Sequence, residues 1–593
     1  RKHLAEARRR GMDPLDYASH LFGLGNALVW RRSAGWAGYC FAEGLPSHPK
    51  LQQRRVHRLA HLSTVSSLRQ QVLDQDLMFV APIFEQVLNL KRSWKPDLYR
   101  RLRFAPPEAI ETAMGRAASE QLMDYARGET TRLWPDASAA LLPLRARIGF
   151  AAILLTIMLL VMLSGIIARP FLIPIVAALL MAPGLLRLAA ALPEPEEQPV
   201  QPLSDAELPH YSVLIPLRDE AQMVPMLKRA MSAIDYPPHL LDIKFVVEAK
   251  SPETVTAVER VLDQPQFRMV VVPQGAPHTK PKAIDYALPL ARGEFLVVYD
   301  AEDVPDPDQL RRAAERFRSD PGLACLQAEL VPENAHENVL TALFAGEYAG
   351  LFGRLLPALA RWGLPVPLGG TSNHFRTSVL RKLGGWDAFN VTEDADLGVR
   401  LARRGYRAEA FDSHTHEEAP LTVRAWMAQR TRWMKGWMQT YCVHNQSPRA
   451  LLRDLGWRGF LGFQVLVGGM ILSSLLHTVF LGTLLGRLIF DGVIGLVPQD
   501  MWDWFAVGIL AAGYGGAFAV VVSGLVHLRA KSLIPIQFAV PFYWVLHSIA
   551  TLLAVRELIV KPVHWAKTEH GKTRVARAGS LPAGKTVLRP RIG

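Results

Sequence analysis

Long stretches without a charged residue constrain this chain more than any other feature. Residues 148–168 contain none, and a second apolar run, residues 170–186, follows after Arg169. Each run is close to the roughly 20 residues with which an α-helix crosses a bilayer core. The short separation leaves no room for a domain between them. The two runs therefore predict a transmembrane hairpin, which we assign to residues 148–190.

Three further apolar runs lie near the C-terminus, at residues 460–490, 505–525 and 533–555. Buried helices of a soluble protein are the alternative, but the lengths favour membrane helices within residues 446–560. The last run contains two prolines. It predicts a broken or interfacial element, because irregular backbone at membrane depth survives only when it is buried in protein. A break inside residues 460–490 is the alternative.

Arginine-rich flanks orient the chain. Residues 1–147 contain several arginine runs, the tail at residues 561–593 is strongly basic, and positive flanks stay in the cytoplasm. The hairpin returns the chain to the same side, so residues 196–445 are also predicted to be cytoplasmic. Five complete spans would place the tail outside, which is why one apolar run is expected to be irregular.

Composition excludes several classes of protein. Half of the residues are hydrophobic and 20% are charged, whereas soluble domains have about 25% charged residues; a disordered or collagen-like chain is excluded. Three distant cysteines rule out a disulfide scaffold and a four-cysteine zinc site. The net charge of +13 suits cytoplasmic flanks that face anionic lipid. The sequence has no basic platform interleaved with aromatic residues, so nucleic-acid binding is not predicted.

The segment 196–445 alternates strands with helices. Short apolar runs predict strands at residues 211–216, 243–248, 268–272 and 294–300. This alternation of strands and helices indicates an α/β domain with a mostly parallel sheet. In such a sheet, ligands bind at the carboxyl ends of the strands. Two predicted strands end there in acids, Glu248 and Asp300. Residues 1–147 instead predict a polar, mostly helical module, for which regulation, partner docking and a stabilising collar are alternative roles.

Three carboxylates gather at the end of the fourth predicted strand, at Asp300, Glu302 and Asp303. Like charges this close repel each other, and a bound cation relieves the repulsion. Oxygen ligands of this kind suit Mg²⁺ or Mn²⁺, which also bind substrate phosphates. A solvated turn is the alternative interpretation.

Other segments carry residue types suited to a phosphorylated ligand. Lys280 and Lys282 precede a predicted helix and suit phosphate charge. Residues 392–396 open another helix with a second acidic group. Helical spacing brings Gln429, Arg432 and Trp433 to neighbouring faces. The histidines of residues 414–418 suggest zinc, but a third ligand with suitable spacing is missing, so we interpret this segment as a loop.

The order of these motifs resembles the family 2 glycosyltransferases, and more narrowly the processive membrane synthases of cellulose and hyaluronan type. The features are a strand that ends in a Pro-x-x-x-Glu turn, an acidic second strand, a variant Asp-x-Asp, a Thr-Glu-Asp and a Gln-x-x-Arg-Trp. A bacterial subgroup of β-glucan synthases, some of which make mixed-linkage (1,3)(1,4)-β-glucan, is similar in four segments. These are Lys280-Pro-Lys-Ala283, Tyr299-Asp-Ala-Glu-Asp303, Trp433-Met-Lys-Gly-Trp437 and Trp565-x-Lys-Thr-x-His570.

The resemblance implies a GT-A fold, the nucleotide-diphospho-sugar transferase fold, in a cytoplasmic domain inserted between transmembrane helices. It implies a multi-pass protein of a bacterial inner (plasma) membrane that polymerises a UDP-sugar, most specifically UDP-glucose, into a secreted β-glucan with inversion. Mg²⁺ or Mn²⁺ is the implied cofactor, and a periplasmic or outer-membrane export protein is an implied partner. Regulation by cyclic di-GMP is possible for this group, but the arginine motif that binds this nucleotide in cellulose synthases is not found in the sequence.

The resemblance also assigns roles to residues. Asp394 matches the general base, and Asp300, Glu302 and Asp303 match the metal-binding acids. Six residues match the donor site: Pro216, Arg218, Glu220, Glu248, Lys280 and Lys282. Five match the acceptor and diphosphate site: Thr392, Glu393, Gln429, Arg432 and Trp433. Four match a gating loop over the donor pocket: Trp565, Lys567, Thr568 and His570.

Two other functions remain open at this point. A non-processive membrane transferase could act on a lipid phosphate, although the Gln-x-x-Arg-Trp motif and the C-terminal spans favour processive synthesis. A catalytically inactive membrane protein could only sense a sugar nucleotide, although retention of Asp300 and Asp394 favours an enzyme.

Overall fold

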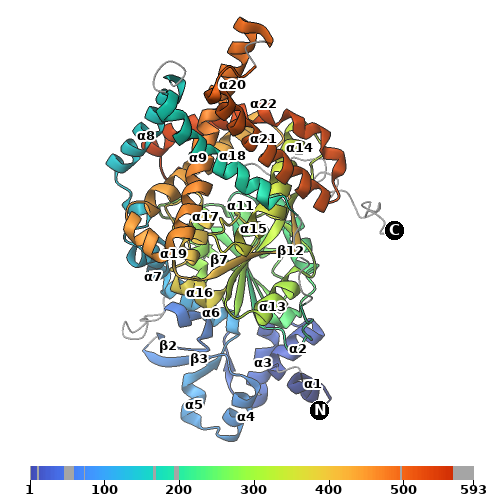
Figure 1. Cartoon of the computed structure of the whole chain (residues 1–593). Coiled ribbons are helices and arrows are strands. Elements are labelled where there is room, and N and C mark those ends of the chain that lie inside the picture. Colours follow the sequence, from blue (N-terminus) through green and yellow to red (C-terminus); the bar gives the residue numbers. More distant parts are fainter. Residues whose placement is uncertain are drawn as a thin grey trace.

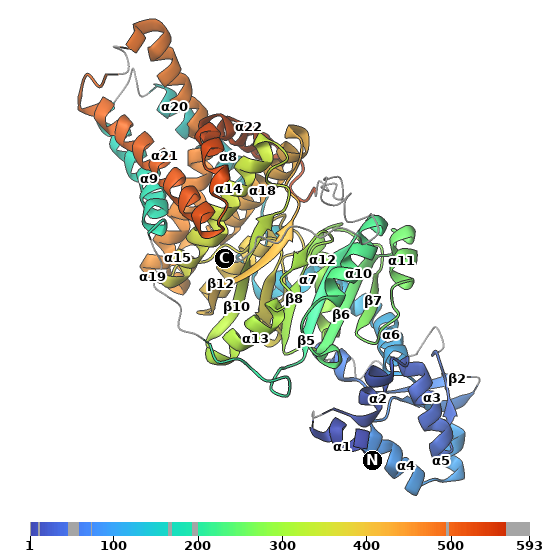
Figure 2. The same cartoon turned by 90° about the vertical axis from the view of Figure 1, so that its right-hand side faces the viewer.

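The computed structural model describes residues 2–9, 12–45, 59–72, 74–163, 169–192, 200–493 and 497–564. The chain is arranged in three tiers. An N-terminal module lies at one end, a large mixed sheet with its helices lies in the middle, and the apolar helices gather at the opposite end (Figures 1 and 2). The α/β domain expected between apolar helices is therefore confirmed.

The N-terminal tier combines helices with a small sheet that was not predicted. Its helices are α1 (Lys2–Arg9), α2 (Pro14–Phe22), α3 (Asn26–Ala37), α4 (Phe84–Arg92), α5 (Pro96–Arg101) and α6 (Pro107–Ala117). The next helix, α7 (Ser119–Leu133), lies beside the central sheet (Figures 1 and 2). The strands of the N-terminal tier are β1 (Cys40–Phe41), β2 (Ser67–Val72), β3 (Gln75–Val80) and β4 (Leu102–Phe104), in the order β1-β4-β3-β2. Two of these strands are only two and three residues long, too short for a periodic pattern, and their pairing is decided by the tertiary fold.

The central tier is an eight-stranded sheet in the order β7-β6-β5-β8-β11-β10-β12-β9. Its strands are β5 (Tyr211–Leu217), β6 (Leu241–Glu248), β7 (Phe267–Val272), β8 (Phe295–Val298), β9 (Val304–Pro305), β10 (Leu323–Pro332), β11 (Asn373–Arg376) and β12 (Arg407–Glu417). The first four strands in the sheet are parallel, as predicted. Strand β11 runs antiparallel to both its neighbours, so the sheet is mixed.

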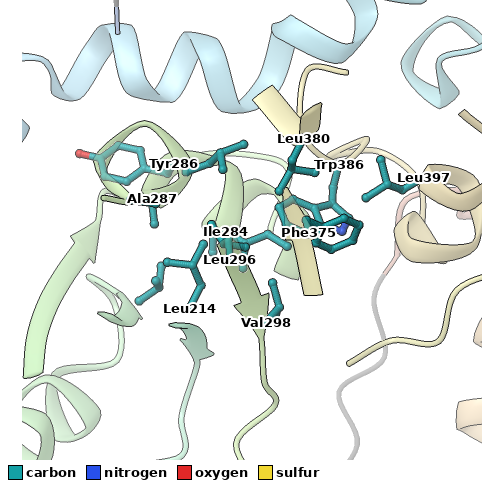
Figure 3. Close-up of a cluster of buried hydrophobic side chains, with 14 of the residues drawn as sticks. Leu214, Ile284, Tyr286, Ala287, Leu296, Val298, Phe375, Leu380, Trp386 and Leu397 are labelled. Atoms are coloured by element: carbon teal, nitrogen blue, oxygen red, sulfur yellow. The ribbon is translucent and has the colours of Figure 1, made fainter. Parts of the chain in front are cut away.

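Helices cover both faces of this sheet. They are α10 (Val224–Ser232), α11 (Pro252–Glu259), α12 (Lys280–Ala287), α13 (Gln309–Ser319), α16 (Thr377–Lys382), α17 (Glu393–Arg403) and α18 (Val423–His444). Successive strand residues point to opposite faces, so Leu214 and Leu296 join one core while Val213 and Phe295 join the other. Figure 3 shows the first core, where Phe375 and Trp386 pack beside the strand residues.

The third tier consists of apolar helices: α8 (Leu144–Leu163), α9 (Arg169–Ala190), α14 (Val339–Gly350), α15 (Leu356–Arg361), α19 (Pro448–Phe463), α20 (Gly469–Asp491), α21 (Met501–His527) and α22 (Val540–Val560). Small residues let α9 and α21 approach closely. A Cβ at Gly184 would lie 2.5 Å from the Ala512 carbonyl oxygen, and one at Gly516 would lie 2.1 Å from the Gly184 oxygen. Close contacts through small residues are typical of helix packing in membranes.

Among the described residues, five helices are long and apolar enough to cross a membrane: Leu144–Leu163, Val339–Arg361, Pro448–Asp491, Met501–His527 and Lys531–Val560. The second of them was not predicted. Its most apolar window is 67% buried in the protein, against 17% for the first. This helix packs between the sheet and α21, so polar and charged residues in its sequence find partners in the protein.

The last apolar run is irregular only at its beginning. Pro535 lies in a 3-10 turn, Pro535–Ala539, and Pro541 lies in the first turn of α22. Proline is tolerated there because the first amide groups of a helix have no intrahelical partner. A single π-helical turn, Gln464–Gly468, links α19 to α20, so the alternative break inside residues 460–490 does not occur.

Candidate active site

One cavity of about 530 Å³ begins at the carboxyl ends of β5, β6 and β8 and continues among α9, α20, α21 and α22. Most of the predicted site residues line it, although they come from six separate segments of the chain. They are Pro216, Arg218, Glu220, Glu248, Lys280, Asp300, Glu302, Thr392, Glu393, Asp394, Gln429, Arg432 and Trp433. The tertiary fold thus brings together the residues expected for donor, metal, base and acceptor.

Six predicted residues are not part of this lining. Lys282 and Asp303 are fully buried behind the cavity wall. The four residues assigned to a gating loop, Trp565, Lys567, Thr568 and His570, lie outside the described residues.

The lysine at the start of α12 faces the acids at the end of β8. Lys280 Nζ lies 2.6 Å from Asp300 Oδ1 and also donates to the Gly370 carbonyl oxygen. Burial alone would lower the pKa of Lys280, but the carboxylates of Asp300, Asp394 and Glu393 raise it above its usual value. A permanent positive charge therefore stands beside the carboxylates, where a diphosphate would need it.

Asp300 and Glu302 present two carboxylates to the cavity. The described part of the chain contains no group of three histidine, cysteine or acidic residues suited to hold a metal ion by itself. Two carboxylates still fit Mg²⁺ or Mn²⁺, because these ions commonly take one or two protein carboxylates and fill their coordination with water and substrate phosphate. The residues present are therefore compatible with a cation that arrives with a nucleotide.

Asp303 has a different position from the one predicted. Its Oδ2 accepts hydrogen bonds from the Asp300 backbone amide, at 2.6 Å, and from the Thr371 hydroxyl. Burial, with the nearby charges of Asp300 and Glu302, raises the pKa of Asp303 well above its usual value. Since burial favours its neutral form, Asp303 closes the turn after β8 and holds Asp300 in place. In this geometry Asp303 lies behind the cavity wall and not in its lining, so its role as a metal ligand stays a prediction.

The first turn of α17 carries two neighbouring carboxyl groups. Burial raises the pKa of Asp394 to about 6, although Lys280 and a hydrogen bond from Trp386 act in the opposite direction. Burial and the charge of Asp394 raise the pKa of Glu393 to about 8. Asp394 thus ionises first and is a carboxylate near neutral pH, as a general base must be.

On the donor side, a buried ion pair holds the acid at the end of β6. Lys282 Nζ lies 2.8 Å from Glu248 Oε1, and Glu248 is 4% exposed. The other oxygen, Glu248 Oε2, is buried and has no hydrogen-bond partner among the described residues. Buried polar atoms are normally paired, so this oxygen is suited to accept a hydrogen bond from a ligand. Lys282 acts through Glu248 rather than by facing the cavity.

Helix α18 completes the site beside α17. A Cβ at Gly436 would lie 2.3 Å from Thr392 Cγ2, so glycine at this position allows the two helices to meet. The ring of Trp433 stacks with that of Tyr348, with centroids 6.3 Å apart and planes at 22°. Burial lowers the pKa of Arg432, but a guanidinium remains charged in proteins.

Sequence reasoning did not identify several residues of the cavity wall. Tyr348 belongs to the helix that was not predicted, and Trp437 appeared only as part of a motif. Glu417, at the end of β12, lies close enough to Asp300 and Glu302 for their charges to raise its pKa, although burial is the larger cause. Only the clustering of acids in residues 414–418 could have drawn attention to it.

The part of the cavity among the apolar helices is lined mostly by aliphatic residues, and several aromatic and polar side chains stand among them. His477 Nε2 lies 2.6 Å from the Tyr514 hydroxyl oxygen, and the Tyr514 ring stacks on Trp544 at 5.2 Å. His547 and Ser473 also line this part. Flat rings and hydrogen-bonding groups therefore continue from the catalytic end into the helical tier.

Comparisons with known proteins place this geometry in a family. Residues 295–554 match the family model described as glycosyl transferase family group 2. A probable glycosyltransferase, YdaM, from Bacillus subtilis is 28% identical over 233 residues, which are 39% of this chain and 56% of the relative. The beta-monoglucosyldiacylglycerol synthase of Trichormus variabilis is 27% identical over 242 residues, 40% of this chain and 50% of the relative.

Two further similarities concern mannosyltransferases. Glucomannan 4-beta-mannosyltransferase 2 of Arabidopsis thaliana is 30% identical over 144 residues, 24% of this chain and 27% of the relative. The solved structure of the mannosyltransferase PcManGT from Pyrobaculum calidifontis, in complex with GDP-Man and Mn²⁺, is 20% identical. It aligns over 66% of this chain and 99% of its own, with a TM-score of 0.41. The chain spans about half the length of the first curated relatives that it matches.

The family match includes the elements on which the site depends. It begins at β8, which delivers Asp300 and Glu302, and continues through α17 with Asp394 and α18 with Trp433. The mixed sheet with its covering helices is an α/β fold. Residues 295–554 of this chain therefore match a family 2 glycosyltransferase domain.

Proposed function

We propose that this protein is a processive, inverting β-glycosyltransferase that polymerises a UDP-sugar, most specifically UDP-glucose, into a β-glucan. Mixed (1,3)(1,4) linkage is the form of product that the motif resemblance favours. The observation that carries the proposal is one continuous cavity, which runs from Asp394 into the helical tier, where aromatic and polar side chains such as Tyr514, Trp544 and His477 stand among its apolar lining. A growing glycan needs such a path, because each added sugar must move away from the reacting centre.

The reaction follows from the groups at the catalytic end. The hydroxyl oxygen at the end of the acceptor attacks the anomeric carbon of the donor, and Asp394 takes the hydroxyl proton. The bond from that carbon to the diphosphate oxygen breaks, and UDP leaves with the electron pair. A single displacement converts an α-linked donor into a β-linked product.

Positive charge stabilises the leaving diphosphate. Lys280 and Arg432 both line the cavity that the acids also line, and preorganised charge that meets developing charge is an effective form of catalysis. A Mg²⁺ or Mn²⁺ ion held by Asp300 and Glu302 would supply further positive charge at the diphosphate. Glu248 would accept a hydrogen bond from the nucleoside, since its free oxygen is buried.

The same geometry suggests a membrane orientation. The central sheet, whose strand ends adjoin the catalytic end of the cavity, and the arginine-rich N-terminal module lie on one side of the apolar helices (Figure 2). Positive flanks favour the cytoplasm, where nucleotide sugars are made available. We infer a multi-pass protein of a bacterial inner membrane, with synthesis in the cytoplasm and product passing outward between the helices to an export partner.

A lipid acceptor is the second candidate, because relatives such as that from Trichormus variabilis are named for glucosyl transfer to diacylglycerol. The apolar helices would give a lipid access. The polar groups of His477, Tyr514 and His547 favour a carbohydrate instead, since burying such groups against acyl chains costs free energy.

Product size tests the proposal. Membranes containing the protein are incubated with radiolabelled UDP-glucose, and the product is divided into solvent-extractable lipid and high-molecular-weight glycan. We expect labelled polymer that β-glucan-specific hydrolases digest, and none from the Asp394→Asn variant. Label found only in a lipid carrying one sugar would refute processivity, and a parallel assay with GDP-mannose would reveal a wrong donor.

A matched pair of variants tests the path. Trp544→Ala removes the ring on which Tyr514 stacks in the helical tier, whereas Trp457→Ala alters a tryptophan that is 68% exposed and does not line the cavity. We expect shorter chains at an unchanged rate of first transfer for the former and normal chains for the latter. Normal chain length in both would contradict the proposed route.

A further inference from the structure

A buried indole donates a hydrogen bond to the proposed base. Trp386 is 0% exposed, and its Nε1 lies 2.9 Å from Asp394 Oδ1. Buried tryptophan N–H groups usually find an acceptor, and this acceptor belongs to a residue that lines the reaction cavity. A Cβ at Gly370, which also lines the cavity, would lie 3.9 Å from the other oxygen, Asp394 Oδ2. An indole does not titrate, so it donates to Oδ1 at every pH.

The indole has little freedom to move. Its ring meets that of Phe375 at 90°, with centroids 5.6 Å apart, and Leu380 and Leu397 surround it in the same core (Figure 3). The Trp386 backbone amide donates to Asp285 Oδ1 at 3.1 Å. A Cβ at Gly385 would lie 2.0 Å from that same oxygen, so the close approach of this backbone to Asp285 depends on glycine.

The N-terminal part of the chain holds the loop that carries this tryptophan. The Thr130 hydroxyl, on α7, lies 2.8 Å from the Gly384 carbonyl oxygen and 2.9 Å from that of Trp386. Trp134 Nε1 donates to the Leu383 carbonyl oxygen at 3.1 Å. These contacts join segments about 250 residues apart in sequence, and α7 precedes the first apolar helix.

We infer that Trp386 is a positioning residue for the carboxylate of Asp394, and that α7 sets the position of this indole through Thr130. The inference rests on the proposed function only in naming Asp394 as the base. It gives the N-terminal segment a part in the geometry of the reacting centre, which neither the motifs nor the family match includes, since that match begins at residue 295.

Two consequences follow from losing the indole N–H. A hydrogen bond to the ionised form of an acid lowers its pKa, and the Trp386 bond acts in this direction against burial. The other charged groups that face Asp394 are Lys280, Asp300 and Glu393, and none of them is altered. The pKa of Asp394 should therefore rise, and its freed carboxylate should sample orientations that do not reach the acceptor.

The test replaces Trp386 with β-(3-benzothienyl)alanine, which keeps the shape of the side chain and exchanges the N–H for sulfur. We expect kcat to fall about tenfold, the acid limb of its pH profile to move up by about one pH unit, and the Kd for UDP to stay unchanged. The same replacement of Trp30, which is buried in the N-terminal module, controls for the method and should change none of these.

A second pair of variants tests the role of α7. Thr130→Val removes the hydroxyl, whereas Thr130→Ser keeps it. Valine should move the acid limb in the same direction as the indole replacement, and serine should restore the wild-type profile. An unchanged kcat and acid limb in the Trp386 replacement would overturn the positioning role, and equal profiles for the two Thr130 variants would overturn the part of α7.

Titration of Asp394 without turnover separates this inference from the proposed function. The carboxylate band assigned from the infrared difference between wild type and Asp394→Asn reports the ionisation directly. A wild-type protein that makes no polymer would refute the proposed function. A band whose midpoint is the same with and without the Trp386 N–H would refute the positioning role, whatever the product.

Discussion

Removing the charge of Asp394 should abolish turnover while making the protein more stable. Asp394→Asn keeps the size of the side chain, and its amide oxygen can still accept the hydrogen bond from Trp386, at 2.9 Å in the wild type. It removes the proton acceptor, and general-base assistance is typically worth about 10²–10⁴ in rate. Binding of UDP should stay near normal, because the base faces the acceptor rather than the nucleotide.

The gain in stability follows from the pKa of this group. The pKa of Asp394 rises from 3.8 to about 6 on folding, which corresponds to about 3 kcal/mol at 1.36 kcal/mol for each pH unit. Because the folded pKa of this acid is raised, its ionisation opposes folding increasingly between those two pH values and fully above about 6. At pH 7.5 the neutral asparagine avoids this cost, so the melting temperature in detergent should rise.

The assay combines both measurements on one preparation. Initial rates with radiolabelled UDP-glucose give turnover, and thermal unfolding is followed at pH 7.5 and pH 5, where the stability difference between variant and wild type should shrink. Wild-type turnover would refute the assignment of the base. If Glu393→Gln then lost turnover instead, the base would be Glu393. Lost turnover with a lower melting temperature at pH 7.5 would show that the reasoning about burial is wrong.

Four further outcomes are expected. Exhaustive chelation with EDTA should abolish transfer and Mg²⁺ or Mn²⁺ should restore it, and Asp300→Asn should weaken Mn²⁺ binding measured by electron paramagnetic resonance; full activity after chelation would refute a metal role. In the wild type, kcat should fall as the pH drops below about 6, where Asp394 becomes protonated; a flat profile down to pH 4.5 would contradict this. Truncation after Val560 should abolish synthesis without unfolding the protein, whereas truncation after Ser580 should be nearly harmless; full activity of the shorter chain would remove the gating role. A cysteine introduced near Arg589 should react with an impermeant reagent only in permeabilised cells; labelling of intact cells would place the tail outside.

Local patterns were sufficient for much of this architecture. Runs such as residues 148–168 predicted helices of bilayer length, because apolar length is a property of the chain itself. The buried strands that end at Glu248 and near Asp300 were predicted from their short apolar runs. Their acids lie at the carboxyl edge of a parallel sheet, whatever the packing of the helices. The antiparallel strand β11 and the short strands β1 and β4 were missed, because short strands pair according to partners distant in sequence. The local hairpin of β2 and β3 was also missed, although its two strands are adjacent in sequence.

The sequence by itself determined which residues could perform the chemistry, and the tertiary structure decided which of them face the cavity. The sequence does not distinguish Asp300 from Asp303 within the acidic cluster. In the folded protein the turn after β8 buries Asp303 and places Asp300 beside Lys280. Trp386 has no motif to mark it, and it meets Asp394 in a loop that is held by contacts with distant segments, α7 among them. Burial and hydrogen-bond geometry depend on contacts between distant segments, and these contacts exist only once the chain has folded.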